Sequence, residues 1–204
     1  QVSPVRSLFE LHPSTKGITE NLNRWQAMGA KTLGLYDYGS FNNIDCPAFW
    51  FFLVNNHLKA LNQRWGIRHY LGETDNTIGP SMMLFNIRAQ SLWNRKTNYD
   101  DVLQDICKTF YGNASQSMLA YYRHMHSQML KWELPEGHPT PFVGNAIEYE
   151  LPEVVAGQHY IDAAREENGG DALINSRLNI AEFGHLMFTH YIATRRGEGT
   201  DALT

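Results

Sequence analysis

Apolar side chains recur at helical spacing in two early stretches of the chain, residues 18–28 and 47–65. Each stretch stops directly before a glycine, Gly29 or Gly66, the residue type that most often follows the last turn of a helix. The apolar positions are Ile18, Leu22, Trp25 and Met28 in the first stretch and Phe51, Val54, Leu58, Leu61 and Trp65 in the second. An apolar stripe on a helix faces the core, so we predict two amphipathic helices with both tryptophans buried.

Short apolar runs follow the two glycines and are typical of buried strands. The first, residues 31–37, ends in Asp37, and the second, residues 67–72, runs into Glu73 and Asp75. The order strand, helix, strand predicts a βαβ unit with parallel strands. Binding sites in such sheets lie beyond the carboxyl ends of the strands, so we expect the acids to share one rim.

The rest of the chain has the apolar periodicity of helices, separated by glycine and proline. Asn98 is a candidate N-cap, Gly112 a helix stop, and Gly169-Gly170 the turn of a helical hairpin. The predicted helices span residues 80–93, 99–110, 114–132, 153–167 and 171–195.

Two strands alone make a poor sheet, whereas a complete TIM barrel, (β/α)8, takes about 250 residues. This chain has 204 residues. We therefore predict an α/β fold: the C-terminal portion of a TIM barrel in residues 1–96, followed by an α-helical bundle in residues 97–204. A small self-contained α+β unit is the alternative.

Composition narrows the classes of partner and cofactor. The formal net charge of −4 gives no reason to expect nucleic acid or an anionic membrane as partner, and no apolar run is long enough to span a bilayer. Cys46 and Cys107 lack the spacing of metal ligands, and His124 and His126 point apart on a helix. We expect no metal and no cofactor.

Two segments carry a family resemblance: GETDNTIGPSMMLFNIRAQSLWN, residues 72–94, and NYDDVLQDICKTFYGNAS, residues 98–115. The first resembles the end of the barrel in bacterial α-glucuronidases, where a glycine-bounded turn leads into an aromatic-rich helix that closes with Leu-x-Trp-Asn/Asp. The second resembles the next helix, which ends in Phe-Tyr-Gly-x-Ala. The same combination marks a group of bacterial glycoside-hydrolase-like proteins known only as a domain of unknown function. The resemblance covers residues 20–125 well and the final helical hairpin loosely.

The resemblance implies hydrolysis of glycosidic bonds, a reaction that generally uses two carboxyl groups. Asp37 then lies on the strand that carries a base carboxylate in α-glucuronidases, and Glu73 lies where those enzymes tend to have a substrate-binding Asn. The earlier strands, where the general acid is expected, are absent, so we expect this chain to be part of a larger one. We also expect an extracytoplasmic location, periplasmic or secreted.

The candidate site residues surround these two acids. The catalytic candidates are Asp37 and Glu73, and the substrate-binding candidates are Tyr36, Tyr38, Tyr70, Asp75 and Trp93. Each has a structural alternative: a cap or rim salt bridge for Asp37, loop solvation for Glu73, a turn for Asp75, and core packing for the aromatic residues.

Three functions are consistent with the sequence. The first is a glycoside-hydrolase-like protein that acts on or binds a polysaccharide or oligosaccharide. The second is a non-catalytic carbohydrate-binding or scaffold domain, in which aromatic stacking carries the affinity. The third is a helical interaction module in residues 114–195.

Overall fold

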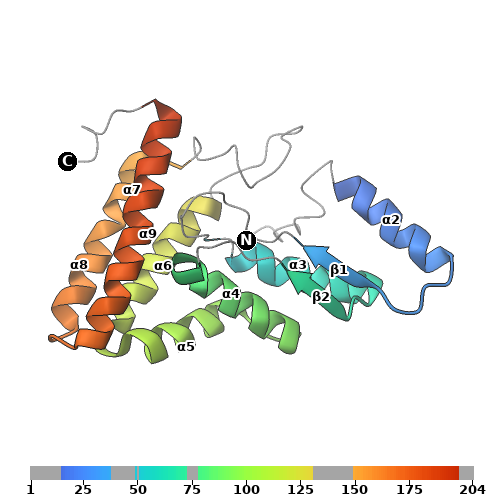
Figure 1. Cartoon of the computed structure of the whole chain (residues 1–204), viewed down its shortest axis with the longest axis horizontal. Helices are drawn as coiled ribbons and strands as arrows, with labels where there is room; N and C mark the ends of the chain where they lie inside the picture. Colours follow the sequence, from blue (N-terminus) through green and yellow to red (C-terminus); the bar gives the residue numbers. More distant parts are fainter. Residues whose placement is uncertain (1–14, 38–48, 50, 73–77, 131–148, 198–204) are drawn as a thin grey trace, which may run out of the picture.

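The computed structural model describes residues 15–37, 49, 51–72, 78–130 and 149–197, and most of these residues are helical (Figure 1). In chain order the elements are α2 (Thr15–Ala27), β1 (Gly34–Asp37), α3 (Phe51–Trp65), β2 (His69–Gly72), α4 (Ile78–Trp93), α5 (Tyr99–Tyr111), the 3-10 turn η1 (Gly112–Ala114), α6 (Ser115–Leu130), α7 (Leu151–Ala156), α8 (Gln158–Glu167) and α9 (Ala172–Arg196).

The prediction of a TIM-barrel portion is wrong. Within the described ranges the sheet consists of β1 and β2 alone, each four residues long. Every element described after β2 is a helix, because the apolar periodicity from residue 78 onward is helical. The fold is therefore mainly α-helical, with one βαβ unit in which α3 lies between the two strands in the sequence.

Glycines end the first two long helices, as the sequence predicts. Gly29 has φ +89° and Gly66 has φ +62°, backbone conformations that side-chain-bearing residues rarely adopt. The burial predicted for the two tryptophans holds for one of them. Trp65 is buried and its Nε1 donates to Asn23 Oδ1 at 2.8 Å, which ties α3 to α2, whereas Trp25 is 57% exposed.

One core runs through the helices on both sides of the predicted domain boundary at residue 96. Its buried members come from every described helix, including the 3-10 turn η1, and from Phe49 and Ile67 outside the helices. The Phe49 ring belongs to this core and makes edge-on contacts with Phe51, Tyr121 and Phe188, at centroid distances of 6.2, 6.0 and 5.6 Å. These four aromatic side chains thus fill a core, where aromatic rings contribute most to packing.

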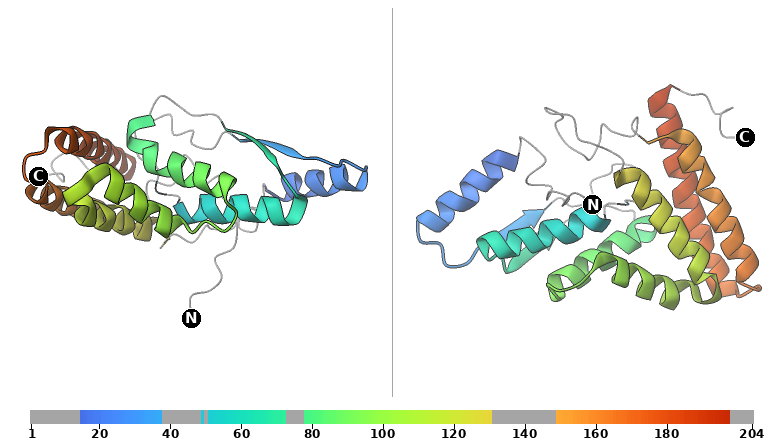
Figure 2. Two further views of the ribbon diagram at one scale, coloured as in Figure 1. Left: turned by 90° about the horizontal axis from the view of Figure 1, so that it is seen from below. Right: turned by 180° about the vertical axis from the view of Figure 1, so that it is seen from behind.

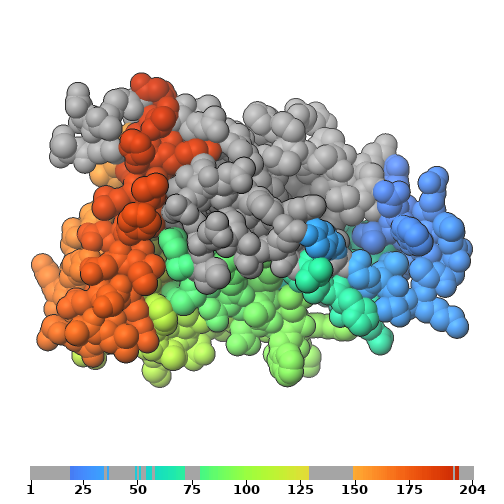
Figure 3. Space-filling model, viewed as in Figure 1, coloured from blue at the N-terminus to red at the C-terminus, as the bar shows by residue number. Residues whose placement is uncertain are grey.

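The C-terminal hairpin forms between α8 and α9, at one end of the molecule, with α2 at the other end (Figure 3). Gly169 and Gly170 turn the chain with φ +64° and +93°, and the Asp171 carboxylate then caps α9 by accepting from the backbone N–H groups of Leu173 and Ile174. The helix predicted over residues 153–167 is split at Gly157 into α7 and α8.

Candidate functional site

The carboxyl ends of β1 and β2 lie side by side. The strands are parallel, with Gly34 opposite His69 at the start of the pair and Asp37 opposite Gly72 at the end. The predicted parallel arrangement is thus confirmed, and the rim where both strands end, which we call the strand-end rim, begins at Asp37 and Gly72. Both strands lie along one side of α3 and α4 (Figure 2).

Several predicted site residues lie outside the part of the chain that the structure describes. These are Tyr38, Glu73 and Asp75, together with the side chain of Asp37. The roles of these residues stay predictions. The structure gives only the backbone positions of Asp37 and of Gly72, the residue before Glu73.

The two described tyrosines of the strands are separated by strand alternation. Tyr36 is 48% exposed and is paired with Leu71, which is 63% exposed, so this face of the strand pair is open to solvent among the described residues. Tyr70 is half-buried on the opposite face, where its ring centroid lies 5.9 Å from the Arg88 guanidinium carbon of α4. A ligand on one face therefore contacts only one of the two rings.

Trp93 is the last residue of α4 and is 90% exposed, so the interpretation of this side chain as core is wrong. It also lies away from the strand-end rim. Its neighbour Leu92 lines a pocket together with Ile67 and Arg68, which precede β2, so α4 ends near the start of that strand. A Trp93 contact to a sugar would belong to that end of the molecule.

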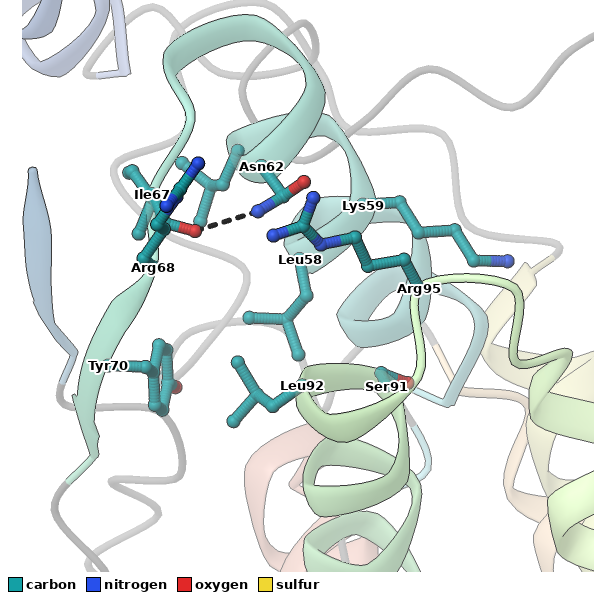
Figure 4. A pocket seen from close by; sticks show the side chains of 10 residues that line it. Leu58, Lys59, Asn62, Ile67, Arg68, Tyr70, Ser91, Leu92 and Arg95 are labelled. Atoms are coloured by element: carbon teal, nitrogen blue, oxygen red, sulfur yellow. Dashed lines mark hydrogen bonds between the residues drawn. The ribbon is translucent and has the colours of Figure 1, made fainter. Parts of the chain in front are cut away.

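That pocket, which we call the basic pocket, has a volume of about 410 Å³ and lies between α3, β2 and the end of α4 (Figure 4). Its lining combines three cations with one amide, two hydroxyl-bearing side chains and a group of apolar side chains. The residues are Leu58, Lys59, Leu61, Asn62, Ile67, Arg68, Tyr70, Ser91, Leu92 and Arg95. Sequence reasoning missed this site because its cations come from positions 59, 68 and 95, which form no motif.

Burial favours the neutral forms of one cysteine and two tyrosines in the described core. Burial raises the pKa of the Cys107 thiol to about 12, so this cysteine is protonated and a poor nucleophile near neutral pH. The hydroxyls of Tyr111 and Tyr122 lie 2.9 Å apart, and burial raises the pKa of both. No group of three or more His, Cys, Asp or Glu side chains suited to a metal ion occurs within the described ranges.

No described helix is both long and apolar enough to cross a membrane. The chain matches no protein-family model, no curated protein and no solved structure. The resemblance to α-glucuronidases therefore stays a prediction that rests on the two sequence segments described above.

Proposed function

We propose that the strand-end rim is a carbohydrate site and that the protein acts on or binds an oligosaccharide or polysaccharide. The observation that supports this proposal is the register of the parallel strands, with Asp37 opposite Gly72. Glu73 follows Gly72 in the sequence, so one acid belongs to the end of each strand. Parallel sheets bind ligands beyond these ends, and glycoside hydrolysis generally uses a pair of carboxyl groups that flank the scissile bond.

The proposed reaction needs no cofactor. One carboxyl group protonates the oxygen of the leaving sugar, while the other acts as base or nucleophile through an oxocarbenium-like transition state. We assign Asp37 and Glu73 to the pair that flanks the sugar. The second candidate is a non-catalytic carbohydrate-binding domain, which is consistent with the partly exposed Tyr36 side chain beside the rim.

Binding tests the proposal without requiring turnover. Isothermal titration of the protein with a panel of neutral and uronic-acid-bearing oligosaccharides should identify a ligand, and Asp37→Asn should weaken its binding by about tenfold, the effect of one charge-assisted hydrogen bond. The matched control is Asp105→Asn, which alters an exposed acid on α5. Binding without turnover supports the second candidate. Equal affinity of Asp37→Asn and the unmodified protein would contradict a carbohydrate site at this rim.

A further inference from the structure

We propose that the basic pocket binds a small organic anion: an acid group, carboxylate or phosphate, attached to an apolar or ring-shaped body. This site is separate from the strand-end rim, because it lies where β2 begins rather than where it ends. It therefore goes beyond the carbohydrate function and can be tested independently of it.

The charge of the lining points to an anion. Lys59, Arg68 and Arg95 line the pocket, and its lining includes no Asp or Glu. Within the described part of the chain the salt bridges are Arg123 with Asp100 and Arg165 with Glu182, so none of the three pocket cations is neutralised by one. The chain as a whole carries a formal net charge of −4, so the positive charge of this pocket is opposite in sign to that of the whole chain.

Two of the cations extend toward the same end of the pocket, where Asn62 lies. Figure 4 shows the guanidinium groups of Arg68 and Arg95 on either side of the Asn62 amide, while the side chain of Lys59 points away. Asn62 is fixed in place because its Nδ2 donates to the carbonyl oxygen of Ile67 at 2.8 Å. Guanidinium groups present paired N–H donors that match the oxygen atoms of a carboxylate or phosphate, which makes an acid group the chemical complement of this end of the pocket.

The other end of the pocket is apolar. The side chains of Tyr70 and Leu92 face each other there, with Leu58 beside them (Figure 4). A volume of about 410 Å³ is within the range of small-molecule sites and exceeds what an inorganic ion fills. A ligand that uses both ends is therefore an acid on a ring-sized body, rather than a free anion.

Four probes separate these features in titrations of the full chain by calorimetry and ligand-observed NMR. Benzoate and phenyl phosphate carry both an acid and a ring, inorganic phosphate lacks the ring, and benzamide lacks the charge. We expect one or both ring-bearing acids to bind at least about tenfold more tightly than phosphate or benzamide. Arg68→Gln and Arg95→Gln should each weaken that binding by about tenfold, because each removes a charge-assisted contact.

Arg24→Gln is the matched control, because Arg24 is an exposed arginine on α2 that does not line the pocket. It should leave the affinity unchanged, and far-UV circular dichroism should show that all variants are folded. Equal binding of benzamide and benzoate would overturn the assignment of an anion. If phosphate binds as tightly as phenyl phosphate, the ligand does not need a ring-sized body, and that part of the proposal is overturned. If a double variant that carries both Arg68→Gln and Arg95→Gln binds with unchanged affinity, the basic pocket is not the binding site.

Discussion

Acidification from pH 7 to pH 4 should lower the free energy of unfolding by about 3 kcal/mol through His185 alone. His185 lies on α9 and is 1% exposed, and burial lowers its pKa from 6.5 to about 4. In the unfolded chain His185 therefore takes up a proton near pH 6.5, whereas in the folded protein it takes up a proton only near pH 4. The stability is fully present above pH 6.5 and is lost progressively as the pH falls to 4.

The surroundings of His185 explain why its neutral form is favoured. Its ring contacts Tyr121 at a centroid distance of 5.6 Å, and a Cβ atom placed on Gly157 would lie 2.9 Å from His185 Cε1, so the ring is closely packed. Glu182 and Asp162 raise the pKa of His185, but burial, the largest effect, outweighs them, and His124 lowers it further. Burial also lowers the pKa of His126, so protonation of this residue adds to the loss of folding stability in acid.

Urea unfolding curves at pH 7 and at pH 4.5 measure this effect. The unmodified protein should lose far more stability between the two values than His185→Gln, in which the buried position has no group to protonate. His190→Gln is the control, because it removes an exposed histidine from the same helix. An acid-induced loss in His185→Gln as large as that of the unmodified protein would show that His185 is not its source.

Glu73→Gln should reduce turnover of a hydrolysed oligosaccharide by about 100-fold or more, since the amide keeps the size of the side chain but cannot exchange a proton. Initial rates at saturating substrate provide the measurement, and they should be made on the longest natural polypeptide that contains this chain. Glu166→Gln, at an exposed position of α8, should retain full turnover. Undiminished turnover in Glu73→Gln removes this residue from the mechanism.

Local features of the fold follow from short-range chemistry and were predictable from the sequence. The stop at Gly66 depends on one φ angle, and the cap of α5 depends on the Asn98 side chain, which accepts from the Asp100 backbone N–H at 3.0 Å. The parallel pairing of β1 and β2 follows from the helix between them, because adjacent strands joined by a crossover helix run the same way.

Features that depend on distant partners were not predictable. An apolar run specifies a buried strand but not how many strands lie beside it, so the pattern that gives β1 is equally typical of a barrel. The helical spacing of Trp25 predicts burial, yet the α2 position leaves it 57% exposed. The basic pocket brings together Lys59, Arg68 and Arg95 only through the packing of α3, β2 and α4.

NMR titration of ¹⁵N-labelled protein with a neutral oligosaccharide ligand will show whether the carboxyl ends of β1 and β2 form one carbohydrate site. We predict that the largest amide shift changes occur together at Asp37 and Gly72, which are opposite each other in the register. Unchanged amide shifts at both positions, with shift changes concentrated on α8 and α9 instead, would contradict a carbohydrate site at the strand-end rim.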